Sequence, residues 1–312
     1  PKFEVIFVDE AQDLSLIQWD IVKKLEKNSK QSIIAGDDDQ AIYKWNGADA
    51  DSFINLEGEK VILQQSYRVP QKIFNVANNI IKKVKNRVEK NWVPKEDLGE
   101  VKYHWEIDRV DLSQGEWLIL ARTNLFLEKI AYYLDQNDFY FQRRNSTPRV
   151  KNIYSLIENW NKLREGIPLH YNDYKKITNK MSKNVDLKSM KHMSKEDFYD
   201  MDTLKEKYGL KTDEEWYIAF DDLGDHEISK IQKLIKNGED LSKDPRIKIS
   251  TIHGVKGNER DNVVLITDLS NAAYYKYLDN PDDEHRLFYV GVTRAKKELN
   301  IIYAKTERGY DI

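Results

Sequence analysis

Residues 3–13 read FEVIFVDEAQD, a largely apolar run that ends directly on two carboxylates, Asp9 and Glu10. Because the run is almost continuously apolar, we expect residues 3–8 to form a buried strand. An amphipathic helical pattern follows over residues 16–25, and a second short strand, 32–36, leads into the acidic loop 37–40. Strand, helix and strand predict a parallel α/β sheet, in which ligands bind at the carboxyl ends of the strands.

The same alternation resumes after Gly58. We expect strands at 60–63, 116–121, 247–251, 262–266 and 299–303, and helices at 71–84 and 125–136. Between 151 and 244 the strand signal largely disappears, and the sequence becomes polar and helical. We therefore predict four segments: 1–58, part of a first α/β domain; 59–150, the first half of a second; 151–245, a helical insertion; and 246–312, the second half of the second domain.

The composition excludes several classes of protein. The chain has 312 residues, enough for two or three domains, no cysteine, and six scattered histidines, so we expect neither disulfides nor a thiolate or histidine metal cluster. It has no run of about 18 apolar residues and no basic-then-apolar leader, which predicts a cytoplasmic protein with no membrane partner. The net charge of −3 gives no general attraction to nucleic acid, so a nucleic-acid partner would need a local basic surface.

Residues 283–295 read DEHRLFYVGVTRA and predict a helix with one apolar face. The helix carries Arg286 and Arg294 toward one end, where they could meet an anion. Solvated or ion-paired arginines are the alternative.

Two further stretches suggest phosphate chemistry and base stacking. Asp9 and Glu10 end a strand, where two carboxylates can hold Mg²⁺ and activate a water, although an acidic helix start capped by Asp13 has the same composition. The loop after Gln40 places Tyr43 and Trp45 beside Lys44, which suits stacking on a single strand, whereas core packing is the alternative.

Five ordered stretches together resemble the motifs of the UvrD/Rep/PcrA family of superfamily 1 DNA helicases. They are VDEAQD (8–13), GDDDQAIYKWNGA (36–48), QSYR (65–68), TIHGVKGNE (251–259) and DEHRLFYVGVTRA (283–295). The resemblance implies a RecA-like P-loop NTPase helicase fold, with an incomplete first RecA-like domain and a second one that carries the helical insertion. It implies ATP and Mg²⁺ as cofactors, and single-stranded DNA and duplex junctions as partners, with protein partners unspecified.

The resemblance also implies roles for single residues. Asp9 and Glu10 would hold the metal, with Glu10 activating water, and Gln40, Arg68 and Arg294 would act on the γ-phosphate. Tyr67 would stack on the adenine and Glu259 would bind the ribose. The residues implied to contact or couple to DNA are Tyr43, Lys44, Trp45, Arg122, His253 and Lys256.

The chain departs from the family pattern at the phosphate-binding loop, because no Gly-x-x-x-x-Gly-Lys-Ser/Thr occurs in it. We expect the sequence to be a C-terminal fragment without appreciable ATPase of its own, taken from a 3′→5′ helicase and single-strand translocase. Gln65, Gly254, Val255 and Arg260 depart from the family within its motifs. The alternatives are the helicase part of a RecB/AddA-like helicase–nuclease and a non-catalytic single-strand binding module. The lysine-rich stretch 175–195 could contact duplex phosphates or form a solvated face.

Overall fold

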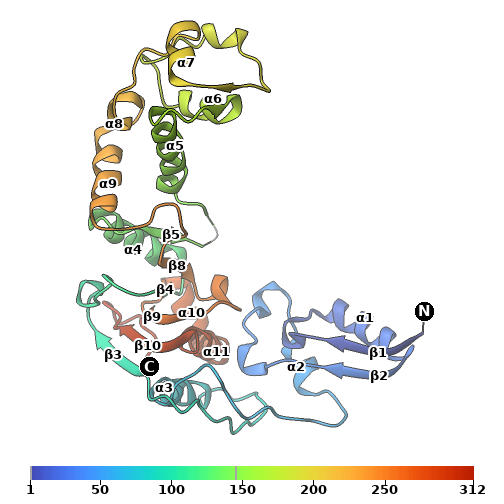
Figure 1. Ribbon diagram of the computed structural model, residues 1–312. Helices are drawn as coiled ribbons and strands as arrows, with labels where there is room; N and C mark the ends of the chain where they lie inside the picture. Colours follow the sequence, from blue (N-terminus) through green and yellow to red (C-terminus); the bar gives the residue numbers. More distant parts are fainter. Residues whose placement is uncertain (1, 145) are drawn as a thin grey trace. The chain divides into compact units, whose positions relative to one another are not determined.

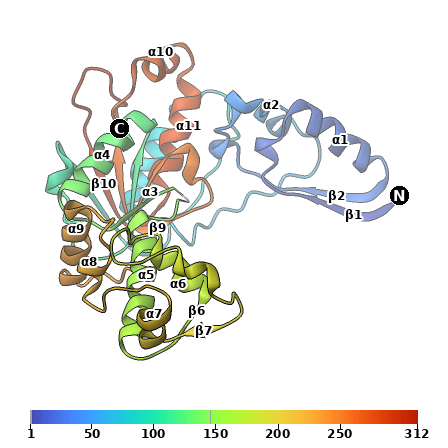
Figure 2. The same ribbon diagram turned by 90° about the horizontal axis from the view of Figure 1, so that it is seen from above.

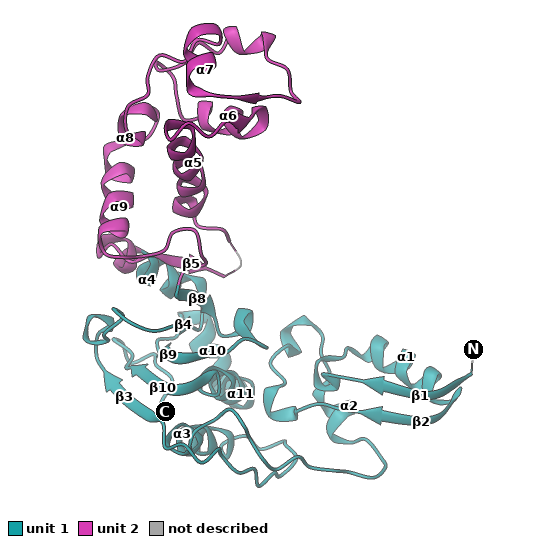
Figure 3. Ribbon diagram, in the orientation of Figure 1, with its two compact units in different colours: residues 1–131, 246–312 teal, residues 132–245 magenta. Residues whose placement is uncertain are grey.

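The computed structural model describes residues 2–144 and 146–312. The chain divides into two compact units, unit 1 with residues 1–131 and 246–312, and unit 2 with residues 132–245 (Figure 3). Unit 1 combines helices with parallel strands, so the predicted α/β class is confirmed. The four-segment division remains a prediction. No helix in the described residues has the length and apolar character needed to cross a bilayer.

The N-terminal part of unit 1 is a strand–helix–strand. It contains β1 (Phe3–Val8), α1 (Leu16–Glu26), β2 (Ser29–Ile34) and the short α2 (Ala50–Ile54). β1 pairs with β2 in parallel, and α1 lies along the pair (Figures 1 and 2). Asp9 and the 37–40 loop therefore follow the same edge of this small sheet, as predicted.

Ser15, rather than Asp13, caps α1. The Ser15 hydroxyl accepts from the Gln18 backbone, and the Gln18 side chain accepts from the Ser15 backbone, forming a capping box. This arrangement leaves the Asp13 carboxylate available for a contact elsewhere.

Two expectations for the first strands were wrong. β1 is not buried, and Phe7 is 75% exposed, because in the described part of the chain its sheet has two strands and a single long helix beside it. Residues 60–63 form no strand, and Val61 and Leu63 are exposed. An apolar run becomes a strand only where a neighbouring strand satisfies its backbone hydrogen bonds, and the described residues provide none there.

The main sheet of unit 1 is parallel, with strand order β3-β10-β9-β4-β8. Its strands are β3 (Glu100–His104), β4 (Trp117–Ala121), β8 (Ile247–Thr251), β9 (Arg260–Ile266) and β10 (Ala295–Ile302). The accompanying helices are α3 (Gln71–Ile81), α4 (Asn124–Gln136, which crosses the boundary into unit 2), α10 (Asn271–Asp279) and α11 (Pro281–Val292). β3 was missed by the sequence analysis. The helix predicted at 283–295 ends at Val292, because Ala295 begins β10.

Helix α11 is the most buried helix of the site, with every residue from Glu284 to Val292 buried. It packs on α3 and on β9, and Phe288 stacks on Tyr310 with ring centroids 4.0 Å apart. Gly291 allows the close approach to the sheet, since a Cβ there would lie 3.1 Å from the Leu265 side chain. Because Glu284 to Val292 are buried, α11 is held firmly in place, and so are the polar side chains of Glu284 and Arg286.

Unit 2 is mainly helical, as expected for the insertion. Its helices are α5 (Arg149–Arg164), α6 (Tyr171–Thr178), α7 (Met201–Lys207), α8 (Trp216–Ala219) and α9 (Asp225–Lys236), and its strands are β5 (Phe141–Arg143), β6 (Leu169–His170) and β7 (Phe198–Tyr199). β6 and β7 pair antiparallel. The unit has its own core, in which Trp160 and Phe220 are fully buried and meet edge to face.

Candidate functional site

Arg294, just beyond α11, is 1% exposed and lies against Gln40. Its Nη2 donates to the side-chain oxygen of Gln40 at 3.2 Å and to the hydroxyl of Thr293, and its Nε donates to the Val290 carbonyl. Within the described residues its Nη1 makes no hydrogen bond, and so retains two donors. Burial, followed by the neighbouring charge of Arg68, lowers the pKa of Arg294 to about 10. A buried guanidinium with unused donors is suited to receive an anion.

Arg68 lies near Arg294 in the loop before α3. Its Nη1 donates to Glu259 at 3.2 Å, while its buried Nε has no hydrogen-bond partner among the described residues. A buried donor atom without a partner is costly unless a ligand accepts its hydrogen bond. Tyr67, the residue before, is 88% exposed, so its ring is open to stack on a planar ligand. These residues could bind a nucleotide. The two guanidiniums suit its phosphate, the Tyr67 ring suits its base, and Glu259 lies beside Arg68.

Asp9 and Glu10 follow β1, and Glu10 adopts the left-handed conformation with φ of 51°. Such a conformation is uncommon for a non-glycine residue and costs about 1–3 kcal/mol, which is typical of functional positions. The Glu10 carboxylate accepts from Gln12 at 2.6 Å and lies 3.3 Å from the Lys256 ammonium. The strained backbone and these two contacts fix the direction in which Glu10 points.

The exposed carboxylate of Asp9 fits a Mg²⁺ ligand. One of its oxygens accepts from the Glu10 backbone at 2.8 Å, which leaves the other oxygen available. Within residues 2–144 and 146–312, no group of three or more His, Cys, Asp or Glu side chains could hold a metal ion. That result excludes an all-protein cage there, but Mg²⁺ commonly uses one or two carboxylates and takes its other ligands from water and phosphate.

Lys256 connects the two strand–helix parts of unit 1. Its side chain is 8% exposed, and its ammonium donates to Asp13 at 2.5 Å and to the Gln40 carbonyl at 3.0 Å. It also lies 5.3 Å from the centre of the Tyr43 ring. Lys256, which the family resemblance implies to couple nucleotide to DNA, thus contacts Gln40 on the predicted nucleotide side and Tyr43 on the predicted DNA side.

Arg87 and Lys90, which the sequence analysis missed, neutralise the acidic loop after β2. Lys90 pairs with Asp37, Asp38 and Asp39, and Arg87 binds Asp39 through two hydrogen bonds of 2.8 and 2.7 Å. The acidic loop 37–40 is therefore a largely buried ionic cluster. The run of three aspartates could have indicated this cluster. Three carboxylates in a row are stable in a buried loop only if cations from another part of the chain pair with them.

Tyr43, Trp45 and His253 form an aromatic group in which Trp45 is 67% exposed. The Trp45 and His253 rings lie 6.0 Å apart, and the Tyr43 hydroxyl donates to the His253 carbonyl at 3.0 Å. Burial and then the charge of Arg122 lower the pKa of His253 to about 4. The group combines two half-buried rings, Tyr43 and His253, with an exposed indole that can stack on a nucleobase.

Arg122 and Arg286 are both engaged within the protein. Arg122 follows β4, and its Nε donates to Glu284 at 2.6 Å in a pair whose side chains are 18% and 4% exposed. Arg286 donates to the carbonyls of Asp38 and Asn86. Arg286 on α11 therefore binds backbone carbonyls of the protein and helps to hold the helix in place, whereas Arg294, eight positions later and beyond the end of α11, meets Gln40.

Four of the predicted residues lie at opposite ends of the strands of the main sheet. Arg122 and His253 follow the carboxyl ends of β4 and β8, whereas Glu259 and Arg294 precede β9 and β10. Helix α11 spans the two groups, with Glu284 in its first turn and Arg294 just beyond its end. A helix rises about 1.5 Å per residue, so this rigid element separates the two groups by roughly 15 Å.

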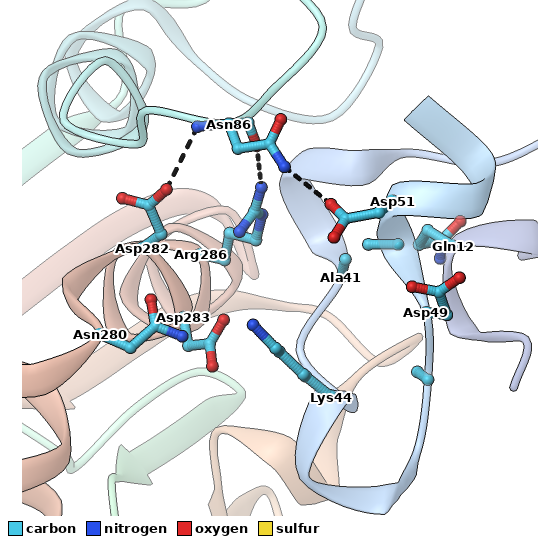
Figure 4. Close-up of a pocket in the computed structure, with 12 residues that line it drawn as sticks. Gln12, Ala41, Lys44, Asp49, Asp51, Asn86, Asn280, Asp282, Asp283 and Arg286 are labelled. Atoms are coloured by element: carbon cyan, nitrogen blue, oxygen red, sulfur yellow. Dashed lines mark hydrogen bonds between the residues drawn. The ribbon is translucent and has the colours of Figure 1, made fainter. Parts of the chain in front are cut away.

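A small cavity of about 100 Å³ lies beside this framework, lined by Lys44, Asp51, Asn86, Asp282, Asp283 and Arg286 among others (Figure 4). Asn86 joins its walls, donating to Asp51 at 2.7 Å through its side chain and to Asp282 through its backbone. Lys44 extends toward Asp283 in Figure 4. Of the predicted site residues only Lys44 lines the cavity, so it is separate from the Arg68–Arg294 group.

Comparisons with known proteins identify the family of the chain. Residues 1–60 match the UvrD/REP helicase N-terminal domain, and residues 120–306, more than half of the chain, match the UvrD-like helicase C-terminal domain. The chain belongs to the UvrD-like helicase family. The resemblance seen in the sequence is thereby confirmed, and the parallel α/β sheet is the RecA-like fold that this family implies.

The relatives of this UvrD-like chain include proteins named ATP-dependent DNA helicase PcrA. That of Bacillus subtilis is 34% identical over 126 residues, which are 38% of this chain and 16% of the relative. That of Staphylococcus aureus is 34% identical over 123 residues, 38% of this chain and 17% of the relative. That of Staphylococcus epidermidis is 35% identical over 145 residues, which are 39% of this chain and 20% of the relative. The matched segments thus span a fifth or less of each relative's length.

Proposed function

We propose that the protein is an ATP-dependent DNA helicase that translocates along single-stranded DNA in the 3′→5′ direction. The observation that carries the proposal is the convergence of Arg294, Arg68 and Gln40, which come from different parts of unit 1 and leave guanidinium donors unused. The polarity rests on the family resemblance alone.

The residues around Arg294 have distinct tasks on the nucleotide side. Arg294 and Arg68 bind the terminal phosphate and stabilise the charge that develops on it. Tyr67 holds the base by stacking, and Glu259 accepts hydrogen bonds from the ribose. Asp9, with Glu10 close by, would hold Mg²⁺, which would neutralise charge at the phosphates when bound. Glu10, fixed by Gln12 and Lys256, accepts the proton of the attacking water.

The DNA side consists of the aromatic group and its basic neighbours. Trp45 stacks on a base, Tyr43 and His253 support it, and Lys44 contributes charge to the phosphate backbone. Lys256 couples this side to the nucleotide, because it holds the Gln40 carbonyl and Asp13 and lies near the Tyr43 ring. Arg122 is paired with Glu284 and lies close enough to His253 for its charge to lower the pKa of that histidine.

The 312 residues by themselves contain no Gly-x-x-x-x-Gly-Lys-Ser/Thr, the loop whose backbone and lysine hold the phosphates in P-loop enzymes. We therefore expect these residues alone to hydrolyse ATP too slowly to drive unwinding. The function is accordingly tested on the whole product of the gene.

The test is strand separation of a short duplex with a single-stranded tail at either the 3′ or the 5′ end. We expect ATP-dependent unwinding of the 3′-tailed duplex, with little unwinding of the 5′-tailed or blunt duplex, and none with ADP. Equal unwinding of both tailed substrates would contradict the polarity. Binding of single strands with no ATP hydrolysis would instead favour a non-catalytic binding module.

A further inference from the structure

We propose that Lys90 is a positioning residue that orients the side chain of Gln40 through Asp37, an inference that rests on the function proposed above. Three contacts connect these residues in series. The Lys90 ammonium lies 2.7 Å from one oxygen of Asp37, and the other oxygen of Asp37 accepts from the Gln40 amide nitrogen at 2.6 Å. The Gln40 amide oxygen in turn accepts from Arg294 at 3.2 Å.

This series allows only one orientation of the Gln40 amide. A carboxylate can only accept hydrogen bonds, and a guanidinium can only donate them. The amide nitrogen of Gln40 must therefore face Asp37, and its oxygen must face Arg294. Flipping the amide would place acceptor against acceptor and donor against donor. The second hydrogen on the amide nitrogen remains available for a phosphate oxygen beside Arg294.

The series depends on an ionised Asp37. Burial alone would raise the pKa of Asp37, but the charge and hydrogen bond of Lys90, together with hydrogen bonds from Gln40 and the Asp39 backbone, hold that pKa below its ordinary value. A charged acceptor gives a shorter and stronger hydrogen bond than a neutral one, which matches the 2.6 Å separation from Gln40. Lys90 therefore acts on Gln40 by keeping Asp37 charged and in place.

Arg87 provides a matched comparison within the same cluster. It is as buried as Lys90, with 12% and 16% of the side chain exposed, and it forms an ion pair with Asp39, one of the three aspartates that Lys90 contacts. Its two hydrogen bonds go to the Asp39 carboxylate, which within the described residues makes no hydrogen bond to Gln40. Loss of either cation disturbs the acidic loop, but only loss of Lys90 interrupts the series to Gln40.

The test that needs no nucleotide is NMR of the Gln40 side-chain amide in the glutamine-¹⁵N-labelled chain, with the signal assigned by its absence in Gln40→Leu. We expect Lys90→Met to shift this signal, Lys90→Arg to restore it largely, and Arg87→Met to leave it in place. Asp37→Asn should also shift it, because an asparagine can both donate and accept, and this variant serves if Lys90→Met does not fold. An unchanged signal in Lys90→Met and Asp37→Asn, or an equal shift in Arg87→Met, would overturn the proposal.

The second readout is the ratio of the dissociation constants for ADP and ATPγS, measured with Mg²⁺ on the whole gene product. We expect Lys90→Met to reduce this ratio about fivefold or more, as loss of about 1 kcal/mol of coupling would, and Arg87→Met to preserve it. If wild type itself does not prefer ATPγS while the Gln40 signal still follows Lys90, the proposed function fails and the positioning role stands. If wild type prefers ATPγS but Lys90→Met retains that preference, the positioning role for the nucleotide fails.

Discussion

The guanidinium of Arg294 donates a hydrogen bond to the side chain of Gln40 across 3.2 Å, although 254 positions separate them in the chain. Arg294 is anchored by α11 and Gln40 by the loop after β2, so this bond joins the two strand–helix parts of unit 1 at the predicted phosphate position. A ligand that binds both residues would therefore act on the relationship between these parts.

Replacing Arg294 with Lys should selectively weaken recognition of the terminal phosphate. Lysine cannot bond Val290, Thr293, Gln40 and a phosphate together, and a hydrogen bond to a charged group contributes about 1.5–3 kcal/mol. We expect ATPγS affinity of the gene product to fall on the order of tenfold or more, with ADP affinity little changed, by titration calorimetry. Arg286→Lys, on the same helix but bonded to carbonyls, is the control. An equal loss for ADP would argue against a γ-phosphate role.

Replacing Trp45 with Ala should weaken binding of single-stranded DNA without affecting stability. The indole is 67% exposed, and base stacking on an aromatic residue contributes about 1–3 kcal/mol. Fluorescence anisotropy with a labelled oligothymidine measures the effect. Trp105→Ala, a similarly exposed tryptophan at 70% after the edge strand β3, should bind as wild type does. Comparable losses in both variants would show that Trp45 has no special role.

Replacing Arg122 with Met should destabilise the fold. Glu284 would lose its partner while only 4% of its side chain is exposed, and breaking a buried pair in this way costs about 3–5 kcal/mol. Urea unfolding of the chain measures the change. Adding Glu284→Gln should recover part of the loss, since it removes the unpaired charge. An unchanged urea midpoint in Arg122→Met would mean that the Arg122–Glu284 pair does not stabilise the fold. That result would favour the DNA-contact role implied by the family.

Acid should destabilise the protein through His253. The pKa of His253 is about 4 in the folded chain, because of burial and the charge of Arg122, and near 6.5 when unfolded. Between these values the unfolded state binds a proton that the folded state does not, so stability falls as the pH falls. The loss between pH 7 and pH 5 is on the order of 2 kcal/mol. His253→Gln should show a smaller loss by urea unfolding; an identical pH dependence would refute this account.

The apolar, largely buried strands of the main sheet were readily predicted from the sequence. β8 was found at its expected residues, and β4 differed by one residue at its start. β3 was missed because it is a polar edge strand, Glu100–His104, with only one neighbour to define it. Residues 60–63 failed for the opposite reason, since their apolar pattern has no adjacent strand in the described chain.

The site shows the same limit. Motif residues such as Arg68, Glu259 and Arg294 were identified from local sequence, and their roles remain predictions that the geometry supports. Lys90 and its pairing with Asp37 could not be identified, because 53 positions separate them and a single lysine after a helix resembles any solvated charge. Pairings that only the tertiary fold creates are not visible in local patterns.

The rate of ATP hydrolysis by the whole gene product, with and without single-stranded DNA, tests the central claim most directly when wild type is compared with Glu10→Gln. Glutamine keeps the shape of Glu10 but cannot accept the proton of the attacking water. We predict that DNA stimulates the wild-type rate and that Glu10→Gln lowers it about 10²–10⁴-fold while nucleotide binding persists. An unaltered rate in Glu10→Gln, or no hydrolysis by the wild-type gene product, would contradict the proposed function.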